Sequence, residues 1–156
     1  MSVLLFIRKR RIRNIWSIAV PNQGTRGRVR VNTSQYLRDI NDIYESNGWG
    51  RGYSDEKIRK MFSASIYRLA VADGASVGLL RAYGDNVVET HVTELAVYKN
   101  HQGKGYGSLL MKDLLDAFSH TAVYVMAFAE NRGFFERFNL KEQSSKFTVY
   151  AVAARQ

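Results

Sequence analysis

The sequence predicts an α/β fold of the α+β kind, in which helices pack on a mixed and mostly antiparallel central sheet. Three observations predict it. The chain has 156 residues, of which 46% are hydrophobic, and this suits one compact domain with an ordinary core. Two segments before residue 64 carry apolar residues at helical spacing. Between residues 65 and 98, apolar runs are separated by short turns of Gly, Asp and Asn, the pattern of an antiparallel meander.

The first elements of the expected domain are a short strand and two helices. Val29 and Val31 alternate with basic residues, as in a strand. Ser34 is a candidate N-cap for the first helix, which the stretch NGWGRGY ends, and Ser54 is a candidate N-cap for the second. The apolar stripe of the first helix consists of Leu37, Ile40, Ile43 and Tyr44, and that of the second consists of Ile58, Met61 and Phe62.

The meander and the elements after it follow in a regular order. Asp73-Gly74 predicts a hairpin turn, and Gly84-Asp85-Asn86 predicts a second turn before the strand VVETHVTELAVY. A helix from about Gly105 to Phe118 comes next. The strand AVYVMAF, a short helix through GFFERF and a last strand KFTVYAVA complete the expected order.

The basic residues are concentrated at the N-terminus. The formal net charge is +9, and residues 1–28 carry +7 of it without any acidic residue, which leaves +2 for residues 29–156. We therefore expect a basic, poorly ordered N-terminal extension over residues 1–28 and a nearly neutral domain over residues 29–156. The apolar runs VLLFI and IWSIAV are too short to span a bilayer. A nucleic-acid arm or an interfacial membrane helix is the alternative interpretation of this extension.

The chain has no cysteine, so disulfides, thiolate zinc sites and a cysteine nucleophile are excluded. A reducing compartment fits this composition, and we expect a cytoplasmic protein. The three histidines, His91, His101 and His120, do not have the spacing of metal ligands, so we expect no metal.

Three glycines, at positions 103, 105 and 107, occur where an apolar strand turns into a helix with one apolar face. Backbone N–H groups at such a helix N-terminus bind phosphate. The Rossmann fingerprint would need a glycine where Ser108 stands, and the Walker A motif fails because Lys104 is followed by Gly105. A tight turn that only lets the helix pack closely is the alternative.

The stretch Gln102-Gly103-Lys104-Gly105-Tyr106-Gly107 matches the Gln/Arg-x-x-Gly-x-Gly/Ala signature, and the chain resembles the GNAT superfamily of N-acetyltransferases. The strand ELAV before it, the helix SLLMKDLL after it and the later stretch AENRGFFERFNL extend the resemblance to roughly residues 29–152. It implies acetyl-coenzyme A (acetyl-CoA) as the donor and a sheet that is splayed at the cofactor. It does not identify the acceptor.

The resemblance also implies which residues hold the cofactor. The N–H groups of residues 103–108 would bind the pyrophosphate, with Gln102 closing the turn, and the strand backbone would pair with the pantetheine amides. The N–H of Val97 would meet the charge that develops on the thioester oxygen. Asn131 would contact the cofactor or cap the next helix. The expected cofactor residues are Leu95, Ala96, Val97, Gln102, Gly103, Lys104, Gly105, Tyr106, Gly107, Ser108 and Asn131.

The chemistry needs a neutral amine, and deprotonating an alkylammonium of pKa near 10.4 at pH 7 costs about 4–5 kcal/mol. The resemblance makes Glu94 the candidate proton acceptor, with Glu89 in reserve, and a solvated strand residue is the equally weighted alternative for Glu94. Phe135 stands where the family usually has a tyrosine that protonates the departing thiolate. Tyr124 and Tyr150 are the other candidate hydroxyls for protonating the thiolate.

We expect the acceptor under the loop YESNGWGRGY, with Tyr44, Trp49 and Tyr53 as walls, or else these aromatics pack on their own domain. The predicted activity is acetyl transfer to a primary amine of a small molecule or a protein. A catalytically weak CoA-binding module and an enzyme that acetylates aminoacyl-tRNA through the basic extension are the alternatives. A second copy of the chain, as a homodimer, is a further candidate partner.

Overall fold

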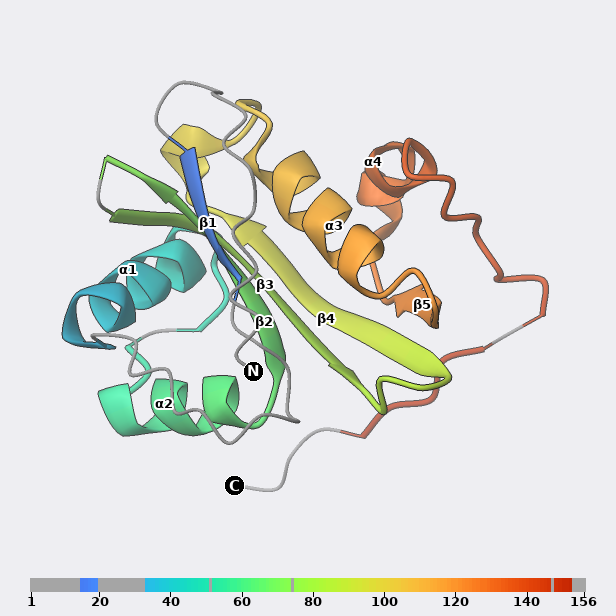
Figure 1. The fold of residues 1–156 in the computed structure, drawn as a ribbon, viewed down its shortest axis with the longest axis horizontal. Coiled ribbons are helices and arrows are strands. Elements are labelled where there is room, and N and C mark those ends of the chain that lie inside the picture. The colour runs from blue at the N-terminus through green and yellow to red at the C-terminus, as the bar shows by residue number, and fades with distance from the viewer. Residues whose placement is uncertain (1–14, 20–32, 51, 74, 147, 153–156) are drawn as a thin grey trace, which may run out of the picture. The chain divides into compact units, whose positions relative to one another are not determined.

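The computed structural model describes residues 15–19, 33–50, 52–73, 75–146 and 148–152 (Figure 1). The chain divides into two units, Met1–Val125 and Met126–Gln156, and each is described by itself. Among the described residues, the first unit contains the sheet, three α-helices and a 3-10 helix, η1 (Lys99–His101). The second contains a short 3-10 helix, η2 (Ala129–Asn131), followed by α4 (Arg132–Glu136).

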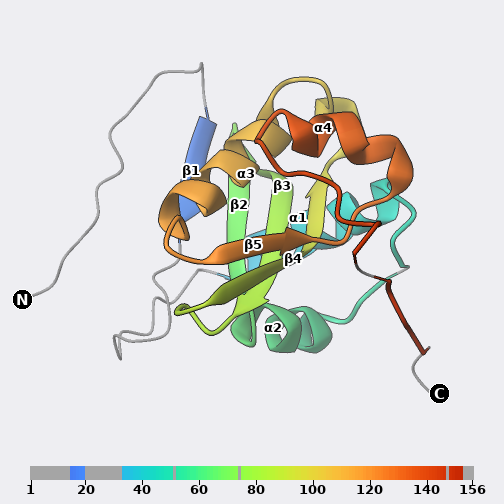
Figure 2. The same ribbon diagram turned by 90° about the vertical axis from the view of Figure 1, so that its right-hand side faces the viewer.

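The sheet of the first unit has five strands in the order of the chain, β1-β2-β3-β4-β5. Neighbouring strands from β1 to β4 are antiparallel, whereas β5 runs parallel to β4. Figure 2 shows the parallel β5 at the opposite edge of the sheet from β1. The strands are β1 (Ile15–Ala19), β2 (Ile66–Ala72), β3 (Ala75–Gly84), β4 (Glu89–Val97) and β5 (Ala122–Val125).

Helices α1 (Thr33–Ser46) and α2 (Asp55–Ser63) pack on one face of the sheet. Their apolar stripes meet the strands in one buried cluster, as the helical spacing predicts. The cluster contains Leu37, Ile40, Ile43, Tyr44, Ile58, Phe62, Leu69, Leu79 and Ala96.

Helix α3 (Tyr106–Ala117) covers the other face, with Leu110, Met111 and Leu114 fully buried. It approaches the sheet closely at Gly78, where a Cβ atom would lie 3.2 Å from the Leu110 side chain and 3.3 Å from a backbone oxygen of β4. A buried ion pair between Arg68 of β2 and Asp113 of α3, with 2.5 Å between Nε and Oδ2, joins the helix to the sheet. This packing fixes the start of α3 beside the end of β4.

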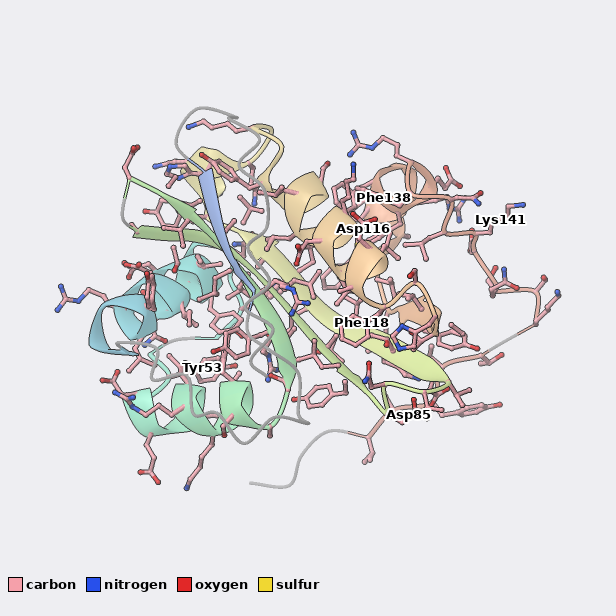
Figure 3. The ribbon with its side chains drawn as sticks, viewed as in Figure 1. Tyr53, Asp85, Asp116, Phe118, Phe138 and Lys141 are labelled. Atoms are coloured by element: carbon pink, nitrogen blue, oxygen red, sulfur yellow. The ribbon has the colours of Figure 1, made fainter. Side chains whose placement is uncertain are left out.

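Local side-chain hydrogen bonds explain where several elements begin and turn. Ser54 caps α2 by accepting a hydrogen bond from the backbone N–H of Lys57 at 3.2 Å. Asp85 closes the turn between β3 and β4, where its Oδ1 accepts from the N–H groups of Val87, Val88 and Glu89 (Figure 3). The hairpin of β2 and β3, with its turn at Asp73, is confirmed, as are the turn at Asp85, the cap at Ser54 and the expected fold class.

Other expectations on the elements differ from the structure. The first helix begins at Thr33, so Ser34 is not its cap. Five residues of the expected basic extension form β1, which pairs with β2 from Ile15–Ala72 to Ala19–Arg68. The predicted strand at Val29 and Val31 and the boundary at residue 29 lie outside the described residues, and the boundary stays a prediction.

The last predicted strand, KFTVYAVA, is wrong for the described residues 148–152, which form no strand. A strand exists only when its backbone groups pair with a neighbour, and alternation in the sequence does not supply that neighbour. In this segment the side chains of Val149, Tyr150 and Val152 are 70–93% exposed. The strand predicted as AVYVMAF is also shorter, since β5 ends at Val125.

Candidate active site

Strand β4 loses its neighbour partway along. Its ladder with β5 pairs Glu89 with Ala122 and, within the part of the chain that the structure describes, ends at Val92–Val125. β4 itself continues to Val97 along β3. A β-bulge lies at this point, because Ala82 pairs with Val92 and Arg81 pairs with Glu94, which leaves Thr93 as the extra residue. The second half of β4 therefore has one edge that β5 does not cover, as expected for a splayed sheet.

The backbone of this half of β4 points its polar groups at the uncovered edge. The N–H of Tyr98 donates to Val77 O at 2.8 Å, which makes Val97–Gly78 a non-hydrogen-bonded pair of the β3–β4 ladder. Since the two kinds of pair alternate, Leu95–Leu80 is also such a pair. The N–H and C=O groups of Leu95 and Val97 thus point away from β3, whereas those of Ala96 bond to β3.

The glycine-rich turn follows directly and leads into α3. Gly103 and Gly105 have φ of +73° and +89°, a backbone conformation that disfavours any residue with a Cβ. Gly105 is the N-cap of α3 and provides no side-chain hydrogen bond to the helix start. The first N–H groups of α3, from Tyr106, Gly107 and Ser108, therefore have no side-chain cap. That this turn binds phosphate stays a prediction, and Lys104 is exposed beside it.

Gln102 links the turn to the strand. Its Nε2 donates to Val97 O at 3.1 Å and to Asn47 Oδ1 at 3.0 Å. Asn47, just after α1, also donates from Nδ2 to Val97 O at 3.0 Å. The carbonyl of Val97 is therefore already bonded, which leaves the N–H of Val97 and both groups of Leu95 for a ligand. Sequence reasoning missed Asn47, because its partners are 50 and 55 residues away.

Glu94 does not lie exposed on its strand. Arg81, opposite it on β3, donates from Nη2 to Glu94 Oε1 at 2.5 Å and from Nε to Oε2 at 2.7 Å. The Tyr44 hydroxyl donates to the same Oε2 at 2.6 Å. The Glu94 side chain is 21% exposed and that of Arg81 is 7% exposed. Both oxygens of the predicted proton acceptor are thus occupied by donors, and accepting a proton would weaken these charge-assisted bonds. The alternative of a solvated strand residue does not describe Glu94 either.

The partners of Glu94 remain protonated. Burial, the hydrogen bond to Glu94 and the negative charge of Glu94 together raise the pKa of Tyr44 far above its ordinary value. Burial lowers the pKa of Arg81, but its hydrogen bonds to Glu94 and the charge of Glu94 outweigh burial and raise it. Neither group changes its charge in the working pH range, so the three residues form a fixed network.

The predicted acceptor walls lie together around α1 and α2. Tyr53 packs edge-on against Tyr44 with ring centroids 5.5 Å apart (Figure 3), and Lys57 Nζ lies 4.4 Å from the centre of its ring. Trp49 packs against the same buried cluster. These aromatics pack on their own domain, and only Tyr44 reaches the network of Glu94. Their contact with an acceptor stays a prediction.

Asn131 and Phe135 belong to the second unit. Asn131 stands at the N-cap position of α4 but makes no side-chain cap hydrogen bond, so the capping alternative is wrong and its cofactor contact stays a prediction. Phe135 packs edge-on against Phe134 within α4. Tyr150 is 92% exposed in this unit, whereas Tyr124 lies on β5 in the first unit.

The described residues contain neither a cluster of metal ligands nor a helix that could span a membrane. In these ranges, no three His, Cys, Asp or Glu side chains gather as a metal site. Of the helices described, none combines the length and the apolar character that crossing a membrane requires.

Comparisons with known proteins identify the family and the fold. The sequence profile of the acetyltransferase (GNAT) domain matches residues 44–152. A search of curated proteins finds no match. Three solved structures that share the fold are a GNAT-family acetyltransferase from Streptococcus pneumoniae (TM-score 0.67, 24% identity, 92% of this chain and 98% of that chain), glucosamine-6-phosphate N-acetyltransferase from Arabidopsis thaliana (0.57, 14%, 88% and 98%) and ribosomal-protein-S18-alanine N-acetyltransferase from Escherichia coli (0.58, 11%, 80% and 74%).

The profile covers more than half of the chain and includes β4, the glycine-rich turn and α3. The solved structures are less than 25% identical to the chain, so they show only that it shares their fold. The family as a whole transfers acyl groups from acetyl-CoA. The chain belongs to the GNAT acetyltransferase family.

Proposed function

We propose that the chain is an acetyl-CoA-dependent N-acetyltransferase that moves an acetyl group to a primary amine of a small molecule or a protein. The observation that carries this proposal is the uncovered edge of β4 beside the uncapped start of α3. The backbone groups at the edge of β4 are suited to hydrogen-bonding a chain of amides, and the N–H groups at the start of α3 are suited to binding phosphates. A molecule that carries both groups in sequence, as coenzyme A does, fits this pair of features.

The first unit supplies the contacts that such a molecule needs. The N–H groups at the start of α3 would hold the pyrophosphate, and the positive φ angles of Gly103 and Gly105 keep Cβ atoms out of that turn. The outward backbone groups of Leu95 and the N–H of Val97 would bond to the pantetheine amides, like an added strand. Bound in this way, acetyl-CoA would supply an activated acetyl group beside the uncovered edge of β4.

Backbone N–H groups at this edge are also suited to the reaction itself. A donor directed at the thioester oxygen stabilises the negative charge that develops there when the amine attacks. The N–H groups of Val97 and Leu95 both point to the edge, and their direction supports a role for Leu95 beside the predicted Val97. The acceptor class is supported by two of the neighbours, whose names describe acetylation of a sugar amine and of a protein alanine.

The test is a thiol-release assay with acetyl-CoA and five amines, namely spermidine, tyramine, kanamycin, lysine and an alanyl peptide. We expect saturable, amine-dependent thiol release with at least one of them, and mass spectrometry should find that product heavier by one acetyl group. Release without any acetylated amine would contradict the proposal.

A CoA-binding module without turnover is the second candidate, and one observation favours it. The carboxylate expected to accept the proton is already bonded to Arg81 and Tyr44. Calorimetry with coenzyme A separates the candidates. Binding in a protein that acetylates none of the five amines supports the module.

A further inference from the structure

We propose that Asn47 sets the register in which the pantetheine chain of coenzyme A pairs with the uncovered edge of β4. This inference rests on the proposed function and adds a positioning residue to it. Asn47 follows α1 directly and lies 50 residues from Val97 in the chain. It acts through the backbone of Val97 and not on the reacting atoms.

The side-chain amide of Asn47 joins three segments of the chain. Its Nδ2 donates to Val97 O at 3.0 Å, on β4, and to Ile43 O at 2.8 Å, in the last turn of α1. Its Oδ1 accepts from Gln102 Nε2 at 3.0 Å, and the same Nε2 donates to Val97 O at 3.1 Å. Asn47 and Gln102 thus form an amide clamp, in which two side-chain amides bind one backbone carbonyl and orient each other.

The amide clamp fixes the peptide group between Val97 and Tyr98. The N–H of this group donates to Val77 O on β3 at 2.8 Å, and its C=O accepts from both amides of the clamp. A planar peptide group that is bonded at both ends does not rotate freely. The end of β4 therefore stays on β3, and the N–H of Val97, in the preceding peptide group, keeps its direction toward the uncovered edge.

Pairing along the edge of a strand repeats every two residues. The groups of β4 that point to the edge belong to Leu95 and Val97, which lie about 6.6 Å apart along the strand. The amide clamp occupies one of these four groups, the carbonyl of Val97, so the two residues offer a ligand different partners. A chain of amides therefore meets one register in which its groups are all paired. Without the clamp, the free carbonyl of Val97 would offer a second register, shifted by one repeat.

The register decides where the thioester lies. The N–H groups of Leu95 and Val97 are the donors proposed for the charge that develops on the thioester oxygen, and a shift of one repeat would move the acetyl group past them. The phosphates of the nucleotide part would bind the N–H groups at the start of α3, which lie beyond the clamp in the chain. Loss of the clamp should therefore change the binding of the pantetheine part and spare the nucleotide part.

The experiment compares two ligands by calorimetry. One is coenzyme A, and the other is adenosine 3′-phosphate 5′-diphosphate, which is its nucleotide part without pantetheine. Asn47→Ala should weaken the binding of coenzyme A about fivefold or more, which corresponds to at least one lost hydrogen bond. The affinity for the nucleotide should change less than about twofold. The thiol-release assay should show kcat at saturating acetyl-CoA lower by about tenfold or more, because cofactor bound in the second register is misaligned.

Asn41→Ala is the matched control. Asn41, on α1, also donates from Nδ2 to a backbone carbonyl, that of Tyr53 at 2.8 Å, but this bond holds the loop after α1 instead of β4. It should lose stability like Asn47→Ala and keep its affinity for both ligands. Asn47→Asp is a second test variant, because it keeps the size of the side chain and removes both donors. It replaces Asn47→Ala in the comparison if the alanine variant does not fold.

The outcomes separate this inference from the proposed function. An unchanged affinity for coenzyme A and an unchanged kcat overturn the inference and leave the function standing. Equal losses with both ligands show a general loosening of the turn and also overturn it. A selective loss with coenzyme A, in a variant as stable as Asn41→Ala, supports the inference even if wild type acetylates none of the five amines, a result that overturns the function alone. Wild type that does not bind coenzyme A overturns both.

Discussion

Arg81 and Glu94 face each other across β3 and β4 and are joined by two hydrogen bonds, of 2.5 and 2.7 Å. The pair sits directly after the β-bulge at Thr93, where the sheet begins to splay. The Tyr44 hydroxyl ties it to α1. These three side chains thus connect β3, β4 and α1 at the point where β4 loses its pairing with β5.

The first prediction is that this pair stabilises the fold. Glu94→Gln leaves the buried guanidinium of Arg81 without its counter-charge, so the free energy of unfolding should fall by about 3–5 kcal/mol. Urea denaturation measures it. Glu56→Gln is the matched control, because the Glu56–Lys60 pair is exposed and should contribute less than about 0.5 kcal/mol.

Replacing both charges tests whether the unpaired charge of Arg81 causes the loss of stability in Glu94→Gln. Arg81→Met combined with Glu94→Met removes the pair without leaving one buried charge alone. The double variant should be more stable than Glu94→Gln. If Glu94→Gln were as stable as Glu56→Gln, the pair would not hold the splayed strands together.

The second prediction concerns Gly105 at the start of α3. A valine there is strained, because φ is +89°, and the cost of a left-handed conformation is about 1–2 kcal/mol. Its side chain would also stand at the N–H groups that we expect to hold the pyrophosphate. Calorimetry should show that Gly105→Val weakens coenzyme A binding at least tenfold, or about 1.4 kcal/mol.

Gly52→Val is the control for backbone strain. Gly52 also has positive φ, +58°, with open space around the position of a Cβ, but it lies in the loop between the first two helices. Both variants should lose similar stability, and only Gly105→Val should lose affinity. Equal affinity in the two folded variants would argue against a phosphate site at this turn.

The third prediction separates the two parts of the N-terminal segment. Deleting residues 1–14 leaves β1 in place and should leave the melting temperature and the turnover number nearly unchanged. Deleting residues 1–28 removes β1, exposes the edge of β2 and forfeits ladder hydrogen bonds that contribute about 1 kcal/mol each. The melting temperature should fall.

Turnover per folded molecule should survive the longer deletion as well, because β1 and β5 lie at opposite edges of the sheet. Circular dichroism measures the melting temperatures of the two deletion variants, and the thiol-release assay measures their turnover. A loss of turnover in the shorter deletion would mean that residues 1–14 contribute to the active site.

The fourth prediction is a pH dependence that arises at Asp85. Hydrogen bonds from the N–H groups of Val88, Val87 and Glu89 lower the pKa of Asp85 below its ordinary value of 3.8. A lowered pKa in the folded state gives stability that is present above pH 3.8 and is lost as the pH falls through the lowered value. Asp85→Asn keeps an oxygen for the turn but does not titrate. Its melting temperature, relative to wild type, should therefore be lower at pH 7 and approach parity in strong acid, and a constant difference would contradict the assignment.

The sequence by itself determined the class of fold, the meander and the glycine-rich turn, because these depend on neighbours within a few residues. Apolar residues at helical spacing define α1 and α2, and glycines adopt the positive φ angles that the turn requires. The signature around Gln102 indicated the family, which the profile match then showed. Ser54 and Asp85 act on backbone groups no more than four residues away, so local reasoning was sufficient for them.

The tertiary structure decided what depends on residues distant in the chain. Alternation cannot say whether a strand finds a neighbour, so it missed β1 and predicted a last strand that the described residues 148–152 do not form. Glu94 looks solvent-exposed in the sequence, but Arg81 and Tyr44 reach it from 13 and 50 residues away. Likewise, only the packing of α1 on the sheet brings Asn47 to the carbonyl of Val97, 50 residues away in the chain. Strand register and helix packing, which arise from the whole core, decide which candidate is bonded and which is exposed.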